Sequence, residues 1–263
     1  MKNHENKEID YSAEIQKLAY SLKEDIINIR RKFHKYPELS WQEFKTAEQV
    51  VRMLKENGLV VKSGICGMGV VADFQGGQSG KTVAIRADMD ALPMYDAKSV
   101  PYASKITGVM HACGHDSHMA MAIGVAKVLT SLKVNLPGTV RFIFQPSEEA
   151  TPSGAYELVK EGVMEGVDAV LAFHVDPEIT VEKIGLREGI LTAYCNEFKL
   201  TILGKSGHAA RPHHSIDTIY LSNLVLSALY DIVGNRTQSF IPAVLSIGKI
   251  AGGTKANIIP ERV

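Results

Sequence analysis

Residues 82–90 read TVAIRADMD, a mostly apolar run that is followed at once by two carboxylates, Asp88 and Asp90. The apolar residues occupy consecutive positions instead of alternating ones, which favours a strand covered on both faces, as in a helix-flanked sheet. A carboxylate at the end of such a strand is costly unless it is paired or bound to a cation. The alternative is a loop turn in which an aspartate caps the next element.

Strands and helices alternate around this run. Three further segments share its composition and are predicted to be strands: 69–74, 139–144 and 169–175. Helical stretches at 118–132 and 155–161 fall between them. Ahead of them, apolar residues at spacings of three and four predict a helix over 11–33, which Tyr36 and the proline after it should end, and a second helix stopping at Gly58. The alternation predicts an α/β domain whose strand-end loops hold the site.

The pattern changes near Gly185 to Gly189. Beyond it we predict a strand at 198–203, a Gly/His-rich loop, a long helix at 216–233, a strand at 243–250 and a short apolar segment at 258–259. We therefore expect a larger domain over 1–188 and a smaller α+β unit over 189–263.

Composition excludes several classes of protein. Lys+Arg and Asp+Glu both number 29, so the formal net charge is zero and gives no electrostatic reason to expect a nucleic-acid partner. The sequence contains only three scattered cysteines, too few for a disulfide framework, and a reducing, cytoplasmic location is expected. The first ten residues lack the apolar run of a signal peptide, and no segment approaches about 18 consecutive apolar residues, so no membrane span is expected.

The segment HACGHDSH, residues 111–118, is dense in metal-binding side chains. Cysteine and histidine are common ligands of borderline transition metals, and Gly114 lets the backbone bring Cys113 and His115 toward one ion. The alternative is a capped helix start, with Asp116 or Ser117 as the N-cap. Capping explains one residue of the group, whereas metal binding explains several.

Two further strand ends carry possible ligands. Glu148 and Glu149 follow the strand at 139–144, where one acid can bind a metal while the other acts as a general base. His174 ends the apolar run at 169–175. An acid pair in a loop is usually a solvated surface, and a lone histidine is more often a core residue. Strand ends that converge on one edge of a sheet nevertheless make a metal site.

The loop at 204–214 joins a strand to a helix in the smaller unit and contains His208. A loop histidine can donate a hydrogen bond to a developing oxyanion. The alternative is a glycine-rich turn followed by a helix cap near Ser215.

Together these segments resemble the M20 metallopeptidase family, in particular the amidohydrolase branch with N-acyl-amino-acid amidohydrolases, hippurate hydrolases and auxin-conjugate hydrolases. The segments that carry the resemblance are RADMDALP at 86–93, HACGHDSH at 111–118, QPSEE at 145–149, FHV at 173–175, the loop at 204–212 and NIIP at 257–260. They occur in the family's order, and the resemblance extends over essentially the whole chain.

The resemblance implies a helix-flanked, mostly parallel sheet that holds a dinuclear metal centre, and a smaller inserted α+β domain that serves as lid and dimer interface. Implied metal ligands are Cys113, His115, Glu149 and His174, for two divalent ions of zinc, manganese, cobalt or nickel. The resemblance implies further roles for four residues: Glu148 as the catalytic base, Asp90 as a carboxylate that orients a ligand, His208 as a lid histidine that polarises the scissile carbonyl, and Asn257 as a residue near the substrate carboxylate. The implied substrate is an N-acyl amino acid or small peptide-like amide, as for an aminoacylase, and the implied assembly is a homodimer.

One feature departs from the family. Its members continue past the lid segment and supply a last histidine ligand, whereas this sequence stops at Val263. We therefore expect a truncated chain, and the alternative function is a catalytically impaired remnant that only binds metal or dimerises. A third possibility is a hydrolase that uses Cys113 as nucleophile with a nearby histidine.

Overall fold

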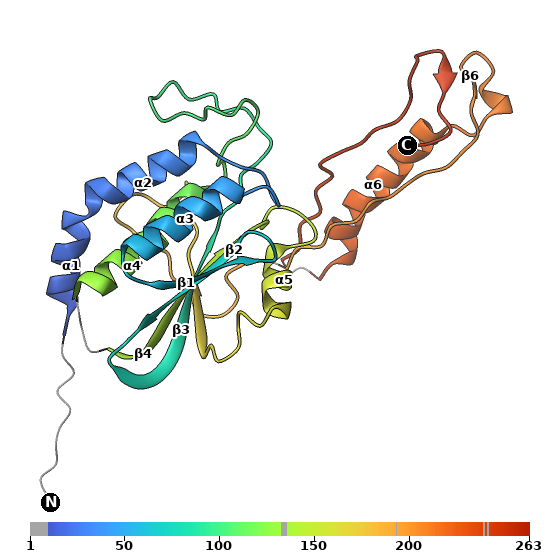
Figure 1. The fold of residues 1–263 in the computed structure, drawn as a ribbon. Coiled ribbons are helices and arrows are strands. Elements are labelled where there is room, and N and C mark those ends of the chain that lie inside the picture. The colour runs from blue at the N-terminus through green and yellow to red at the C-terminus, as the bar shows by residue number, and fades with distance from the viewer. Residues whose placement is uncertain (1–9, 133–135, 193, 239, 241) are drawn as a thin grey trace, which may run out of the picture. The chain divides into compact units, whose positions relative to one another are not determined.

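The computed structural model describes residues 10–132, 136–192, 194–238, 240 and 242–263. The chain divides into two compact units, of which the first ends at Thr180 and the second begins at Val181 (Figure 1). This division lies slightly before the domain boundary predicted after residue 188. Within the described ranges, no helix combines the length and apolar character that crossing a membrane requires.

The first unit is built on a five-stranded sheet with the order β1-β2-β4-β3-β5. Its strands are β1 (Val60–Ile65), β2 (Gly69–Gln75), β3 (Gln78–Asp88), β4 (Pro137–Gln145) and β5 (Ala169–Ala172). Strand β3 pairs in parallel with β4 and β5, whereas β2 pairs antiparallel with β1 and β4. The α/β class is confirmed, and the sheet is mixed. Its three parallel strands end at one edge, so Asp88 lies beside Gln145 in the register.

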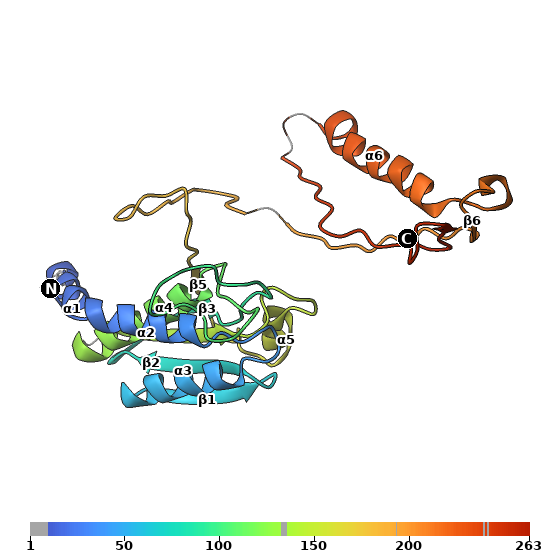
Figure 2. The same ribbon diagram turned by 90° about the horizontal axis from the view of Figure 1, so that it is seen from above.

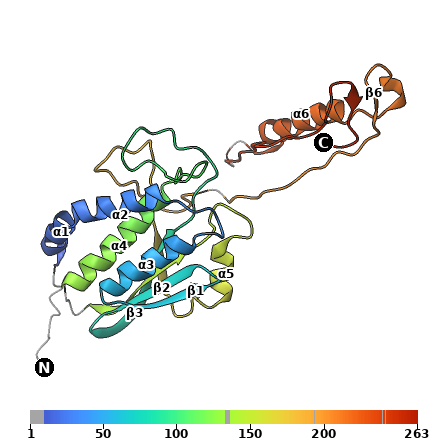
Figure 3. The same cartoon turned by 45° about the horizontal axis from the view of Figure 1, so that its top comes forward.

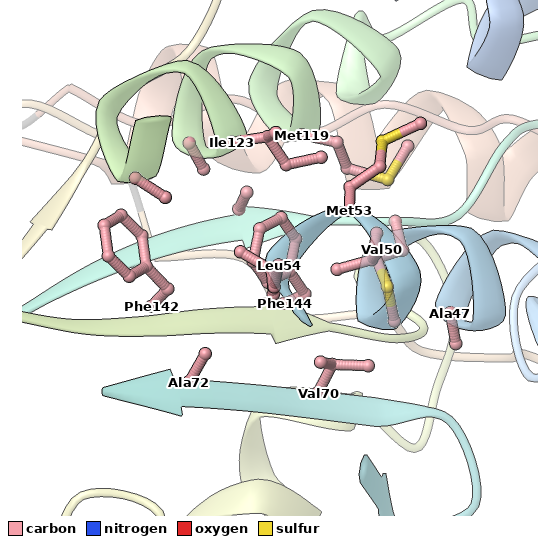
Figure 4. Close-up of a cluster of buried hydrophobic side chains, with 14 of the residues drawn as sticks. Ala47, Val50, Met53, Leu54, Val70, Ala72, Met119, Ile123, Phe142 and Phe144 are labelled. Carbon is pink, nitrogen blue, oxygen red and sulfur yellow. The ribbon is translucent and has the colours of Figure 1, made fainter. Parts of the chain in front are cut away.

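Helices cover both faces of this sheet. They are α1 (Ser12–Ser21), α2 (Lys23–Lys35), α3 (Phe44–Glu56), α4 (His115–Leu132) and α5 (Gly154–Lys160). Figure 3 shows α3 and α4 over one face, where side chains such as Val70, Phe142 and Phe144 form the larger core with them (Figure 4). The side chains of Val71 and Ile143 alternate to the opposite face and form a smaller core with the α5 region.

Three details of the first unit differ from the prediction. The helix predicted over 11–33 is divided at Leu22 into α1 and α2, and no residue of α1 is buried. Strand β1 was not predicted, because Lys62, Ser63 and Gly64 interrupt its apolar pattern. The prediction that residues 169–175 are covered on both faces is wrong: all four residues of β5 are exposed, and none belongs to either of the two hydrophobic cores.

The second unit is built around the long helix α6 (Thr218–Arg236), which confirms the predicted helix (Figure 2). A short 3-10 helix (Pro212–His214) precedes it, and β6 (Gly207–His208) pairs with β7 (Ile258–Ile259). The strands predicted at 198–203 and 243–250 are wrong, because the first segment makes only an isolated antiparallel bridge, Leu203 with Arg262, and the second pairs with no strand among the described residues. Ile202 instead exchanges two backbone hydrogen bonds with Val263.

Candidate metal centre

Helix α4 begins at His115, three residues earlier than predicted, directly after Gly114. Gly114 has φ +89°, a conformation that favours glycine, and its carbonyl accepts the Ser117 and His118 N–H groups. The capping alternative for Asp116 is wrong. That carboxylate is buried and lies 2.7 Å from both His34 Nδ1 and Arg30 Nε.

His115 presents a bare ring nitrogen at this edge of the sheet. Its Nδ1 lies 2.9 Å from the backbone carbonyl of Asp90. A carbonyl can only accept, so Nδ1 carries the proton and Nε2 holds the free lone pair. Nε2 is buried and has no hydrogen-bond partner among the described residues. A buried nitrogen without a partner at a strand-end cluster is the arrangement of a metal-ligating histidine.

The other predicted ligands surround this nitrogen. Cys113 and His174 form one group with His115, and Glu148 and Glu149 form another, with ligand atoms within 4.8 Å of one another in each group. The Glu148 and Glu149 carboxylates lie 3.9 Å and 3.8 Å from His115 Nε2. Thiolate, imidazole and carboxylate donors together suit a divalent transition metal, so the residues present fit such an ion.

Electrostatics at the cluster favour a cation. Burial alone would lower the pKa of His115, but the Asp90, Asp88 and Glu149 carboxylates outweigh it and raise that pKa. Partial burial, together with the neighbouring Glu149, raises the pKa of Glu148. The site therefore holds a surplus of negative charge that a proton or a metal ion would neutralise.

The Cys113 thiol lies 3.2 Å from His174 Nε2, a distance that would also suit a thiol–imidazole pair. Burial and the Glu149 carboxylate raise the pKa of Cys113 to about 12. A catalytic cysteine needs an electropositive setting that stabilises its thiolate, and this setting does the opposite. The environment disfavours the cysteine-nucleophile alternative and favours a thiol that ionises when a cation is bound.

His174 has the same tautomer as His115. Its Nδ1 lies 2.7 Å from the Val175 carbonyl, so Nδ1 carries the proton and Nε2 faces Cys113 with its lone pair. Unlike His115, it is exposed, and it lies in an irregular segment after β5.

A third group of possible ligands joins Asp88, His115 and His118. His118 is fully buried, and both of its nitrogens are occupied: Nδ1 lies 2.7 Å from Asp88 Oδ1, and Nε2 accepts the Val175 N–H at 3.0 Å. Asp88 also accepts from Arg86 at 2.7 Å. Burial would raise the pKa of Asp88, but the His118 hydrogen bond and the Arg86 charge outweigh it and lower that pKa. Asp88 and His118 thus satisfy each other without a metal.

Asp90 does not face the cluster as a free ligand; it holds the neighbouring elements. Its Oδ2 accepts the Glu149 N–H at 2.9 Å and the Ser40 hydroxyl at 2.7 Å. Burial would raise the pKa of Asp90, but the His115 ring 3.3 Å away and the hydrogen bonds from Ser40 and Glu149 outweigh it and lower the pKa to about 2.

A second carboxylate, Glu43, holds the loop after β4 that carries Glu148 and Glu149, which we call the acidic loop. Its Oε1 accepts the Ser147 N–H at 2.7 Å, and Ser147 has φ +47°, a left-handed conformation that is uncommon for a residue other than glycine. Glu43 is fully buried, and burial raises its pKa. Ser40 and Glu43 were not predicted as site residues, although polar residues just before α3 are a signal that could have indicated them.

In the second unit, His208 and Asn257 lie side by side. His208 pairs with Ile258 in the short ladder, and the Asn257 carbonyl accepts the Ala209 N–H at 3.1 Å. His208 Nδ1 accepts the Ala210 N–H at 3.1 Å, so its proton is placed on Nε2. The roles predicted for both residues stay predictions.

Comparisons with known proteins agree with this geometry. An N-acyl-L-amino acid amidohydrolase of Geobacillus stearothermophilus is 43% identical, over 95% of this chain and 68% of that protein. The N-acetyl-L-cysteine deacetylase of Bacillus subtilis is 42% identical, over 92% of this chain and 58% of its own length. A dinuclear metal binding peptidase of the M20 family, also from Bacillus subtilis, has a crystal structure that superposes with a TM-score of 0.69 and 36% identity. The match covers 92% of this chain and 62% of the peptidase chain.

The chain thus spans less than two thirds of the length of the deacetylase and of the solved peptidase. The sequence profile of peptidase family M20/M25/M40 matches residues 84–263, a range that contains all the cluster residues and the antiparallel β6–β7 pair. This chain therefore belongs to peptidase family M20/M25/M40.

Proposed function

We propose that this protein is a metal-dependent amidohydrolase that cleaves the amide bond of N-acyl amino acids or small peptide-like substrates. The observation that carries the proposal is the buried, unpartnered Nε2 of His115, with a thiol and an imidazole in one adjoining group and two carboxylates in the other. The amidohydrolase and deacetylase named above support the reaction class.

Four residues would hold two divalent ions: Cys113, His115, Glu149 and His174. When bound, such ions polarise a substrate carbonyl and lower the pKa of water. The donor set is compatible with zinc, manganese, cobalt or nickel. The groups of possible ligand side chains in the structure support this choice of ligands, and the solved Bacillus subtilis peptidase supports a dinuclear centre.

Glu148 would act as the general base. It lies beside the ligand cluster, its side chain is 40% exposed to incoming water, and no hydrogen bond within the described residues occupies its carboxylate. Because its pKa is raised, its ionised form is a stronger base than an ordinary glutamate. Glu148 would take a proton from the attacking water and return it to the leaving amine. Glu149 is fastened through its backbone to Asp90, which keeps the two acids in distinct roles.

The remaining assignments extend the same proposal. The domain over 1–188 would carry catalysis, and that over 189–263 would serve as lid and dimer interface, with His208 polarising the scissile carbonyl and Asn257 near the substrate carboxylate. Exposed apolar side chains along α6, among them Ile219, Tyr220 and Leu224, support a homodimer. Three free cysteines support a reducing, cytoplasmic location.

The direct test is release of amino acid from N-acetyl and N-benzoyl amino acids with added manganese or zinc. We expect turnover that chelation abolishes, and a kcat lower by about 10²-fold or more in Glu148→Gln, as for loss of a general base. Glu161→Gln, an exposed glutamate of the same domain, is the matched control and should match wild type. Stoichiometric metal binding without turnover on any of these amides would refute the proposal and favour the remnant.

A further inference from the structure

His118 links two elements that no strand pairing joins. It comes from the first turn of α4, and its Nε2 accepts the N–H of Val175, in the segment that follows β5. An N–H can only donate, so Nε2 is unprotonated and the ring proton is on Nδ1, where it is donated to Asp88. The ring therefore has no free lone pair for a metal.

Apart from this contact, the segment around His174 is held mainly by Phe173, which packs against the larger core and lies edge-on to the His118 ring, with ring centroids 5.9 Å apart. It follows the exposed strand β5, has no regular secondary structure, and His174 itself is exposed. The Val175 side chain packs on Gly114, where an added Cβ would come within 2.1 Å of Val175 Cγ2. The hydrogen bond from Val175 to His118 is the one backbone tie between residues 173–175 and α4 in the part of the chain that the structure describes.

The anchor beneath His118 is rigid. Asp88 Oδ2 accepts from Arg86, and Arg86 Nε donates to Gln145 at 2.8 Å, so the ends of β3 and β4 are tied together. His118 and Asp88 are each at most 1% exposed. The ring can therefore transmit the position of the sheet edge to the backbone next to His174.

We propose that His118 is a positioning residue: it receives the Val175 N–H and so fixes where His174 presents its Nε2, without binding metal itself. The expected effect on metal affinity rests on the metal site of the proposed function. The hydrogen bond from the Val175 N–H to His118 does not depend on a bound metal. A second role for the Asp88–His118 pair, as metal ligands, is the competing interpretation.

Two substitutions separate the roles of the two ring nitrogens. Glutamine can place its amide oxygen near the position of Nε2 and keep the Val175 contact. Asparagine reaches only the position of Nδ1, so it keeps the Asp88 contact and loses Val175. We expect amide hydrogen exchange at Val175 to be faster by about tenfold or more in His118→Asn and close to wild type in His118→Gln.

Metal affinity should follow the same order. We expect His118→Asn to weaken zinc binding by about 10-fold to 100-fold, the usual cost of losing a partner that orients a ligand, and His118→Gln to retain most of it. Val175→Ala is the matched control, because it keeps the backbone N–H and removes only the side chain. Amide hydrogen exchange at position 175 should be slower in this variant than in His118→Asn. Activity is not needed for either readout.

The outcomes are decisive even if the proposed function fails. If wild type binds no zinc, the metal site is refuted, while Val175 exchange still tests the positioning role. Equal loss of zinc binding in both His118 variants with unchanged Val175 exchange would overturn the proposal in favour of direct ligation. If both variants unfold, the ring nitrogen chemical shifts of wild-type His118 decide: protonated Nδ1 with bare Nε2 supports the proposal, and the opposite tautomer contradicts it.

Discussion

The cluster has a buried half and an exposed half. The buried half comprises Asp88, Asp90, His115 and His118, each at most 1% exposed, at the end of β3 and the start of α4. The exposed half comprises Cys113, Glu148, Glu149 and His174, which lie on irregular segments and are at least partly open to solvent. Most hydrogen-bonding groups of the buried half have partners within the protein, whereas the side chains of the exposed half converge on His115 Nε2.

The difference shows how the site is organised. Buried carboxylates and imidazoles receive the backbone N–H groups of the exposed half: Asp90 receives that of Glu149, and His118 receives that of Val175. The buried half therefore acts mainly as a scaffold, and under the proposed function His115 and the exposed half would supply the metal ligands and the base. Changes in the scaffold should lower both stability and metal affinity, whereas changes among the exposed ligands should lower metal affinity or activity alone.

The largest effect on stability should come from Asp90→Ala. It leaves the Glu149 N–H and the Ser40 hydroxyl without their acceptor and removes a buried carboxylate that lies 3.3 Å from the His115 ring, which costs about 3 kcal/mol of unfolding free energy. The His115 Nδ1–H keeps the Asp90 backbone carbonyl as its acceptor. Urea denaturation followed by tryptophan fluorescence measures it. Asp168→Ala, which removes one exposed carboxylate that accepts the Thr82 N–H, is the control and should cost less than about 1 kcal/mol. Equal losses of unfolding free energy in the two variants would contradict the structural role assigned to the buried half.

Glu43→Leu should follow, at about 2 kcal/mol, because the buried Ser147 N–H loses its acceptor. Glu43→Gln keeps an amide oxygen at that position and should lie closer to wild type. The same urea titration compares them. If the leucine variant is as stable as the glutamine variant, Glu43 does not hold the acidic loop.

Acid should destabilise the buried half through Asp90. Its pKa is about 2 in the folded protein against 3.8 for an unperturbed group, so its stabilising contribution is complete above about pH 4 and is lost as pH falls toward 2. The shift corresponds to about 2 kcal/mol. Unfolding free energies measured between pH 5 and pH 2 should fall less steeply in Asp90→Asn than in wild type. Parallel curves would show that Asp90 is not the group responsible.

The smallest effect should be that of Ser40→Ala. It removes one of two hydrogen bonds to Asp90 Oδ2 and leaves the Glu149 N–H in place, at a cost of about 1 kcal/mol. Zinc affinity should stay within about threefold of wild type, since no orienting partner of a ligand is removed. A loss of unfolding free energy as large as that of Asp90→Ala would mean that the Ser40 hydroxyl, and not the Asp90 carboxylate, holds these segments together.

Local patterns predicted many of the residues that make up both halves. The apolar run before Asp88 gave β3 its position, and the spacing of Cys113 and His115 around a glycine predicted their convergence. The chain positions of Glu148 and His174 at strand ends indicated one edge of the sheet, because parallel strands end together. These inferences depend only on period and order along the chain.

The long-range contacts of the buried residues could not be predicted in the same way. Asp90 meets Ser40 across 50 positions and Glu149 across 59, and Glu43 meets Ser147 across 104. His118 and His115 belong to one motif, yet their roles differ because of which backbone group each ring nitrogen meets. The burial of β5 was predicted wrongly. An apolar run indicates that a strand needs cover on both faces, but it does not say which part of the chain would provide that cover.

The central claim is that the two halves together bind a transition metal between His115 and Cys113. Titration of the protein with cobalt, followed by thiolate-to-cobalt charge-transfer absorption, tests it most directly. We expect a saturable band that is absent in Cys113→Ser and unchanged in Cys195→Ser, an exposed cysteine of the second unit, with both variants as stable as wild type. Absence of the band in wild type, or its persistence in Cys113→Ser, would show that Cys113 does not bind a metal ion.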